Sequence, residues 1–244
     1  MPAIPAWPTK SLPRLFVRTE LAEGGSVALE AGPANYLGNV LRLGPGAEVL
    51  LFDGISGEWL GRIVEAGKKR MTLMVVAQTR PIEEVPDVIL AFAPVKRAQT
   101  DWLVEKATEL GVARLQPVMT RRTIAERVRL DRLQGISVEA AEQCGRTRLP
   151  TIAEPVALPA FLAALDRRLY FADETGGAAV AGAMVVGPAA LLIGPEGGFT
   201  PEEREQVRAH PRTIAISLGP RILRAETAAL AALATFMALA GDWR

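Results

Sequence analysis

Residues 191–203 read Leu-Leu-Ile-Gly-Pro-Glu-Gly-Gly-Phe-Thr-Pro-Glu-Glu, and no other stretch says as much about the fold. The apolar run 189–193 is short and sharply bounded, which is typical of a buried strand. Glycines and a proline follow at 194–198 and predict a loop with little side chain. Thr200, Pro201 and Glu203 then suit the N-cap, first position and capping box of a helix. A strand, a glycine loop and a helix N-terminus offer backbone N–H groups and a positive dipole end to a ligand.

This layout alone also fits an ordinary tight turn between strand and helix. It lacks the Lys-Ser/Thr of a phosphate loop and the G-x-G-x-x-G of a dinucleotide fold. A second unit of the same kind strengthens the prediction of a site. The apolar run 214–218 is followed by Gly-Pro-Arg-Ile-Leu-Arg at 219–224, and an Ala/Leu-rich helix is expected from 225 to about 240. Two consecutive units with Gly-Pro at the same place predict one pocket built from both loops.

Composition sets limits on the kind of protein. The chain has 244 residues, 49% hydrophobic and 23% charged, which is enough for one large domain or two modest ones. A net charge of +1 does not indicate a nucleic-acid binder, so RNA contacts would need local clusters. The lone Cys144 cannot form an internal disulfide, which favours a reducing compartment. Neither a signal peptide nor an apolar run of membrane-spanning length is apparent, so we expect a cytoplasmic protein.

The hydrophobic pattern changes along the chain. Up to about residue 77, short apolar runs separated by turn signals predict a small β-barrel with one helix at 33–41. From residue 88 onward, strands and helices alternate, which predicts an α/β domain with a mostly parallel sheet. Residues 78–86 are the expected linker, giving domains at 1–78 and 84–244. Ligands of such sheets bind at the carboxyl ends of the strands, where both glycine loops are expected to lie.

The two loop motifs, L-L-I-G-P-E-G-G-F-T-x-x-E and S-L-G-x-R-I-L-R-x-E-T-A, together resemble the signature of the ribosomal RNA small subunit methyltransferase E family. The resemblance extends to residues 105–112, 139–146 and 40–43, and so spans nearly the whole chain. It implies a SPOUT-type domain with a C-terminal trefoil knot, preceded by a PUA-like β-barrel that contacts RNA. The chain departs from the family at Ala34 and Asn35, where a His pair is common.

The resemblance also implies an activity: S-adenosylmethionine-dependent methylation of uridine N3 in 16S ribosomal RNA of the small subunit. A SPOUT enzyme acting on another RNA, such as transfer RNA, and a non-catalytic RNA-binding module are the alternatives. No metal ion is expected. SPOUT enzymes complete each active site across a subunit interface, so a homodimer is expected too. Small residues of the last helix would allow close packing there, namely Ala228, Ala231, Ala232 and Thr235.

Tight glycine loops can read adenine through backbone groups, which accounts for the small residues. The expected cofactor-binding residues are Ile193, Gly194, Glu196, Gly197, Gly198, Leu218, Gly219, Ile222, Leu223 and Arg224. Three of them, Ile193, Leu218 and Ile222, are expected to pack in the core as well. Arg224 is the catalytic candidate, since a cation would stabilise charge developing on the uracil. A salt bridge between Arg224 and Glu226 is the alternative.

Arginine binds phosphates and stacks on splayed bases, so arginines are the candidates for RNA contact. They are Arg14, Arg42, Arg122, Arg146 and Arg148. Pairing with nearby acidic residues on a solvated surface is the alternative for each. His210 is expected to cap a helix end, and Cys144 to be a small packed residue.

Overall fold

The computed structural model describes residues 12–67, 70–125 and 127–244. The chain forms two compact units. Unit 1 runs to Glu83 and also includes Gly145–Arg148, whereas unit 2 comprises Glu84–Cys144 and Leu149–Arg244. The domain limits expected from the sequence placed Gly145–Arg148 in the second domain, whereas the structure places this segment in unit 1.

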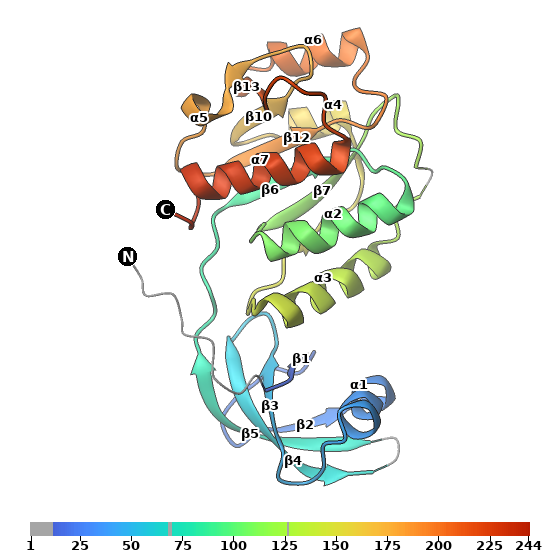
Figure 1. Ribbon diagram of the computed structural model, residues 1–244, viewed down its shortest axis with the longest axis vertical. Coiled ribbons are helices and arrows are strands. Elements are labelled where there is room, and N and C mark those ends of the chain that lie inside the picture. Colours follow the sequence, from blue (N-terminus) through green and yellow to red (C-terminus); the bar gives the residue numbers. More distant parts are fainter. Residues whose placement is uncertain (1–11, 68–69, 126) are drawn as a thin grey trace. The chain divides into compact units, whose positions relative to one another are not determined.

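Unit 1 is built on a five-stranded sheet in the order β1-β3-β4-β5-β2 (Figure 1). Its strands are β1 (Arg14–Phe16), β2 (Ser26–Leu29), β3 (Glu48–Phe52), β4 (Glu58–Ala66) and β5 (Met71–Arg80). A short helix, α1 (Ala31–Asn35), continues into a π-helical turn, η1 (Tyr36–Val40). Alternate residues of the strands face a shared core, as Val49 and Leu51 of β3 do. The short strands and the single helix agree with the sequence pattern.

Unit 2 contains an eight-stranded sheet in the order β11-β13-β10-β12-β6-β7-β8, with β9 also paired to β7. Every pairing in it is parallel. The strands are β6 (Val88–Phe92), β7 (Arg114–Met119), β8 (Thr151–Ile152), β9 (Val156–Ala157), β10 (Arg168–Ala172), β11 (Ala178–Ala179), β12 (Ala189–Ile193) and β13 (Thr213–Ser217). The expected parallel α/β fold is confirmed, while the trefoil knot stays a prediction.

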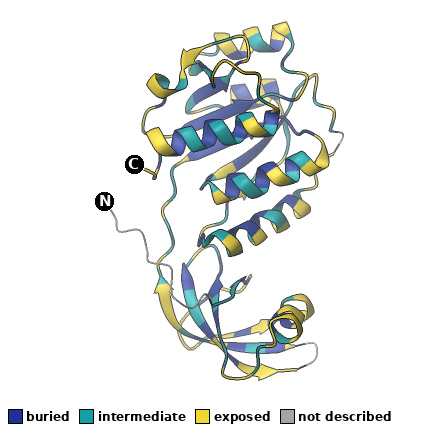
Figure 2. Cartoon of the chain, viewed as in Figure 1, coloured by how far each residue is buried: buried dark blue, intermediate teal, exposed yellow. Residues whose placement is uncertain are grey.

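Helices cover both faces of this sheet. They are α2 (Arg97–Glu109), α3 (Leu130–Cys144), α4 (Leu158–Ala163), α5 (Val180–Ala183), α6 (Pro201–Ala209) and α7 (Ala225–Leu239). The sequence pattern did not indicate α4, α5, β8, β9 or β11, which are all six residues or shorter. The long apolar strands are buried throughout (Figure 2), which is why they read as continuous apolar runs.

The alternation of side chains sorts each strand between two cores. In β12, Leu191 and Ile193 pack on the core beneath α2 and α7, while Leu192 packs on the core beneath α4 and α6. The buried residues of α7 recur every three or four positions, as on one face of a helix, although most of its other side chains are apolar as well. No helix of the described residues is long and apolar enough to cross a membrane.

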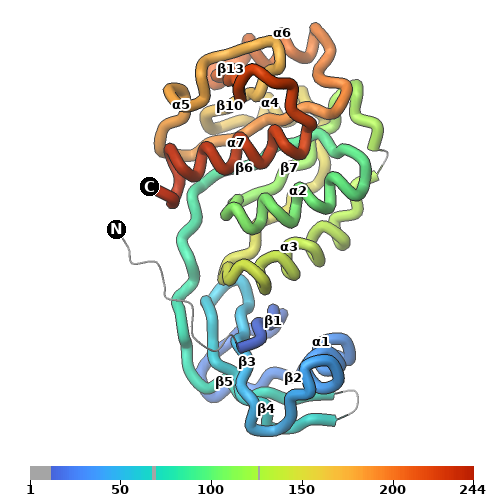
Figure 3. The backbone as a smooth tube through the Cα atoms, viewed as in Figure 1, coloured from blue at the N-terminus to red at the C-terminus, as the bar shows by residue number. Residues whose placement is uncertain are grey.

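The strand order determines which loops meet. β10 pairs with β12 on one side and with β13 on the other, so the connection from β12 through α6 to β13 crosses β10 (Figure 3). Because all three strands are parallel, their carboxyl ends lie at one edge of the sheet. Three loops therefore meet there: one after β10, one after β12 and one after β13.

Candidate active site

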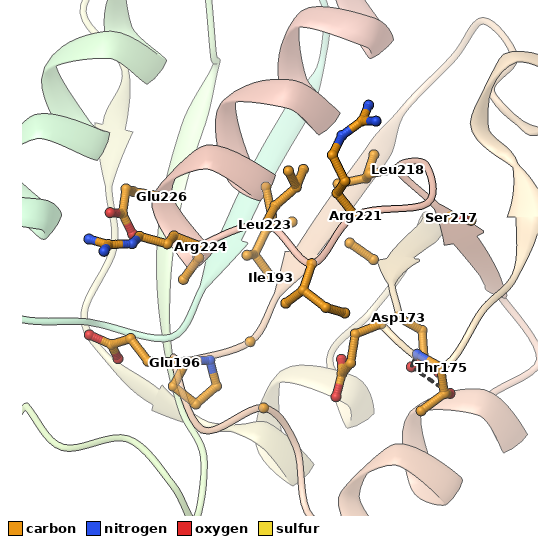
Figure 4. Close-up of a pocket in the computed structure, with 18 of the residues that line it drawn as sticks. Asp173, Thr175, Ile193, Glu196, Ser217, Leu218, Arg221, Leu223, Arg224 and Glu226 are labelled. Atoms are coloured by element: carbon orange, nitrogen blue, oxygen red, sulfur yellow. Dashed lines mark hydrogen bonds between the residues drawn. The ribbon is translucent and has the colours of Figure 1, made fainter.

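A cavity of about 830 Å³ opens where these three loops meet (Figure 4). The loop after β12 contributes residues 193–196 and 198, and the loop after β13 contributes residues 216–226. The loop after β10 contributes residues 172–176, and Lys96, Gln99, Ile124 and Ala228 complete the lining. The prediction of one pocket formed by the two glycine loops is therefore confirmed, with a third wall that the sequence analysis missed.

Gly194 is required by close packing beneath the first loop. A Cβ atom on Gly194 would lie 2.6 Å from a ring carbon of Phe199, whose side chain is buried. That ring in turn packs edge-on against Phe171 of β10, with ring centroids 5.1 Å apart. Any side chain at position 194 would push Phe199 out of this arrangement or itself enter the cavity.

Gly197 does not line the cavity, contrary to the sequence prediction. Its Cβ position faces the stem of Arg122, and its carbonyl accepts a 2.7 Å hydrogen bond from Nη1 of that arginine. The neighbouring Gly198 is the residue with left-handed backbone, at φ 66°. Gly197 therefore lies on the side of the loop that faces away from the cavity, where Arg122 contacts it.

The second loop combines an open backbone with exposed apolar side chains. Gly219 has φ 111°, and a Cβ atom there would meet nothing within 4 Å. Ile222 lines the cavity but is 80% exposed, so its expected role in core packing is wrong. Ile193, by contrast, belongs to the core as well as to the lining, and Leu218 packs against that core.

The third loop, Asp173–Gly176, was not identified as functional from the sequence. Its signal was present, because Asp-Glu-Thr-Gly-Gly directly follows the strand at 169–172. The Asp173 carboxylate is fully buried and accepts hydrogen bonds from the Thr175 N–H at 2.9 Å and from Arg208 at 2.7 Å. Burial alone would raise the pKa of Asp173, but these bonds outweigh it and hold the pKa below its ordinary value of 3.8.

Arg224 stands at the N-cap of α7 and lines the cavity. Among the described residues Arg224 forms no ion pair, so the alternative of a salt bridge between Arg224 and Glu226 is not observed. Figure 4 places Arg224, Glu226 and Glu196 at one end of the cavity and Asp173 and Thr175 at the other. The arrangement offers the Arg224 cation and two carboxylates at one end, apolar side chains in the middle and the arginine-paired Asp173 at the other.

Two of the arginines predicted to bind RNA are structural. The Arg14 side chain is only 9% exposed in unit 1, where its Nε lies 2.7 Å from the Glu58 carboxylate and its guanidinium lies over the Phe52 ring. Arg146 is also buried, 3.3 Å from Glu83, and its carbonyl accepts a hydrogen bond from Arg14. These side chains hold the Gly145–Arg148 segment within unit 1, which corrects the prediction that they contact RNA.

Glu58 is the centre of this cluster. Burial would raise the pKa of Glu58, but hydrogen bonds from Arg80 and Arg14 hold it below its ordinary value of 4.5. Arg80 also donates a 2.9 Å hydrogen bond to the carbonyl of Gly145. Glu58 thus orients two arginines that bind the returning segment, and Glu83 binds the same segment through the Thr147 and Arg148 N–H groups.

The remaining RNA candidates differ in accessibility. Arg42 is exposed and is the non-glycine residue with a left-handed backbone among the described residues, at φ 57°. Arg148 is also exposed, and its N–H and Nε donate to Glu83. Arg122 is exposed and donates to the glycine loop, as described above. His210 is the C-cap of α6, and neither it nor Cys144 lines the cavity.

Two family models match the chain. One, described as an RNA methyltransferase domain, matches residues 83–237. The other, described as an RNA methyltransferase PUA domain, matches residues 33–75. The first match covers most of unit 2, including both glycine loops, and the second lies within unit 1.

Several similar proteins carry the same name. Ribosomal RNA small subunit methyltransferase E of Rickettsia conorii is 30% identical over 91% of this chain and 93% of its own length. The protein of that name from Synechocystis is 33% identical over 93% of this chain and 77% of its own length. The Neisseria gonorrhoeae crystal structure of that name, bound to S-adenosylmethionine, is 30% identical with a TM-score of 0.86, covering 96% of this chain and 100% of its own. A Legionella pneumophila structure with bound SAM is also 30% identical, with a TM-score of 0.87 and the same coverage. On its fold, its loop motifs and these matches, the chain belongs to the ribosomal RNA small subunit methyltransferase E family.

Proposed function

We propose that this protein transfers a methyl group from S-adenosylmethionine to N3 of a uridine in 16S ribosomal RNA of the small subunit. The observation that carries the proposal is the cavity itself. Two glycine loops form two of its walls, and Arg224, a cation without an ion-pair partner among the described residues, lies at one end. Membership of the family supplies the RNA substrate class, and the cytoplasm, where small subunits assemble, is the proposed site of action.

The residues present fit S-adenosylmethionine. At Gly219 the missing side chain leaves the backbone open, so peptide groups can approach a flat adenine ring. Ile193, Leu218 and Leu223 supply apolar contact for the ring faces. The carboxylates of Glu196 and Glu226 lie at the Arg224 end of the cavity and suit the cationic sulfonium and ammonium groups. The volume of about 830 Å³ is within the range of small-molecule sites.

When bound, the cofactor supplies a methyl group open to displacement at carbon. The task of the protein is then to hold uridine N3 in line with that methyl group, because correct orientation removes much of the entropic barrier. N3 gives its proton to water, with an acidity close to that of cysteine or tyrosine side chains, and the sulfonium would leave as a neutral thioether. Arg224 stabilises the negative charge that spreads over the uracil ring, and this interaction strengthens toward the transition state.

Arg42 is the proposed RNA contact of unit 1. A left-handed backbone costs a non-glycine residue about 1–2 kcal/mol, so an arginine there needs another reason. The η1 turn that precedes it in the chain carries two exposed side chains, Tyr36 at 43% and Val40 at 62%. An exposed aromatic ring and an exposed arginine on one segment suit single-stranded RNA, because a ring can stack on a base while a guanidinium binds a phosphate.

The test uses 16S RNA and small subunits from a strain lacking its own enzyme of this class. Purified protein and S-adenosylmethionine labelled in the methyl group are added, and the methylated nucleotide is located by mass mapping. We expect one N3-methyluridine in 16S RNA. Labelling of transfer RNA alone, or of a different atom, would contradict the proposal. Calorimetric titration with S-adenosylmethionine, without RNA, distinguishes a methyltransferase from a non-catalytic RNA-binding module, because the latter would not bind the cofactor.

A homodimer is also proposed, with α7 at its interface. Ala232 is fully buried within its own chain and cannot contribute, which corrects that part of the prediction. A stripe of partly or fully exposed small and apolar residues remains: Thr227, Leu230, Ala231, Ala234, Thr235 and Ala238. Sedimentation equilibrium should give the dimer mass, and Ala231→Glu should reduce it to the monomer mass, while Ala209→Glu on α6 should not. A monomer mass for the wild type at all concentrations would rule out the dimer.

A further inference from the structure

One face of α6 carries two arginines, Arg204 and Arg208, that lie against the third loop of the cavity. They are four residues apart, so their side chains project from the same side of the helix. Both pair with the carboxylate of Asp173, the first residue of that loop, at 3.2 and 2.7 Å. The sequence motifs assigned neither arginine a role.

Arg208 ties the two ends of the loop together. Its Nε donates to Oδ2 of Asp173, and its Nη2 donates to the carbonyl of Gly176 at 2.6 Å and to the Thr175 hydroxyl at 3.3 Å. Arg204 pairs with Glu174 in addition to Asp173. Every residue of the loop, from Asp173 to Gly176, thus contacts a guanidinium of α6.

The loop depends on these contacts because Asp173 is fully buried. A buried carboxylate that loses its cationic partners is strongly unfavourable, since nothing replaces the lost solvation. Without Arg208 only the longer contact with Arg204 would remain, and a shift of the loop toward water would become favourable. The hydrogen bonds from Thr175 to Asp173 would be disturbed in the same movement.

α6 also fixes the glycine loop. The helix begins at its N-cap, Thr200, where a capping box with Glu203 ends that loop. The two loops are in contact, because a Cβ atom on Gly198 would lie 2.9 Å from Oε1 of Glu174. Helix α6 therefore holds two walls of the cavity: its N-terminus holds the glycine loop after β12, and its arginine side chains hold the loop Asp173–Gly176.

We propose that Arg208, assisted by Arg204, is a positioning residue that preorganises the loop Asp173–Gly176 as a wall of the S-adenosylmethionine site. This inference rests on the proposed function. In Figure 4 the labelled loop residues Asp173 and Thr175 lie across the cavity from Arg224 and Glu226. The loop is therefore remote from the proposed reacting end, and its order governs affinity for the cofactor and not the methyl transfer itself.

Calorimetric titration of the purified protein with S-adenosylmethionine, without RNA, tests the proposal. Arg208→Ala should raise the Kd roughly tenfold to a hundredfold, as when outer groups that orient the ligands of a metal site are lost. Arg208→Lys should recover only part of the affinity, because an ammonium cannot bridge Asp173 and Gly176 as a planar fork does. Arg129→Ala is the matched control, since it removes an exposed ion pair with Asp131, and its Kd should stay at the wild-type value.

Steady-state methylation provides the second measurement. For Arg208→Ala, the KM for S-adenosylmethionine should rise in parallel with the Kd, while kcat at saturating cofactor stays close to wild type. Equal Kd values for wild type and Arg208→Ala, or a lowered kcat with unchanged Kd, would overturn the positioning role. If wild-type protein bound no cofactor, the proposed function would fail instead.

The Arg208 side chain is 44% exposed, so the variants should fold. Arg208→Gln provides a second variant that keeps the stem and removes the charge.

Discussion

At the scale of single residues, Arg224 separates binding from chemistry. Replacing it with alanine should lower the single-turnover methylation rate by roughly ten- to a thousandfold, the order seen when one charge-stabilising donor is lost. The Kd for S-adenosylmethionine should change little, because backbone groups hold the cofactor. Arg224→Lys should recover only part of the rate, since it keeps the charge and loses the fork. If saturating cofactor restored the full rate of Arg224→Ala, the residue would be a loop support and not a catalytic group.

Arg42 gives a second prediction at this scale. Arg42→Gly relieves the left-handed strain, so the free energy of unfolding should rise by up to about 1 kcal/mol. The same change should weaken binding of 16S RNA fragments, because a phosphate contact is lost. Arg42→Ala is the control, which removes the guanidinium but keeps the strained backbone. Urea unfolding and filter binding provide the two measurements. If Arg42→Gly gained stability and kept full affinity for RNA, the proposal that Arg42 contacts RNA would be wrong.

At the scale of elements, the N-terminus of α6 depends on Glu203. Its two carboxylate oxygens accept the N–H groups of Arg121, at 2.8 Å, and of Thr200, at 3.0 Å. Glu203→Ala leaves both donors without this acceptor in a buried place, and should cost about 1–3 kcal/mol for each donor that water cannot reach. Thr200→Ala removes only the cap and should cost about 1 kcal/mol.

The denaturant midpoint of each variant checks this order of effects. Glu205→Ala is the control on the same helix, because that residue is exposed and should change stability by less than about 0.5 kcal/mol. A larger loss for Thr200→Ala than for Glu203→Ala would show that the cap, and not the buried acceptor, holds this end of the helix.

At the scale of the whole molecule, buried carboxylates in both units make stability depend on pH. Hydrogen bonds hold the pKa of Glu58 in unit 1 and of Asp173 in unit 2 below their ordinary values of 4.5 and 3.8, although burial acts in the opposite direction. Folded protein then binds fewer protons than unfolded protein at these sites. The stabilisation is complete above the ordinary pKa values and is lost as pH falls through the lower, folded values.

We therefore expect the free energy of unfolding to fall steeply on acidification below about pH 4.5, the ordinary value for Glu58. Glu58→Gln should be less stable than wild type at pH 7, because it leaves Arg14 without its buried counter-charge. The difference between the two proteins should shrink as the pH is lowered. A difference that stayed constant from neutral to acidic pH would show that Glu58 is not ionised in the folded protein.

Features with local causes could be predicted from the sequence alone. The apolar runs predicted the main strands, and Thr200, Pro201 and Glu203 predicted the helix start, because strand burial and helix capping depend on residues a few positions apart. The two glycine loops and the family resemblance followed from the same short motifs. Short elements such as β8 and α5 were missed because a few residues carry too little periodicity to recognise.

Which charges are buried and which loops meet depends on tertiary packing. Arg14 and Arg146 looked like RNA contacts until packing placed them beside Glu58 and Glu83. Asp173 became part of the cavity because β10 lies between β12 and β13, and its partner Arg208 is 35 residues further along the chain. Burial and ion pairing at this separation depend on how strands are ordered in the sheet, and no local pattern of residues encodes that order.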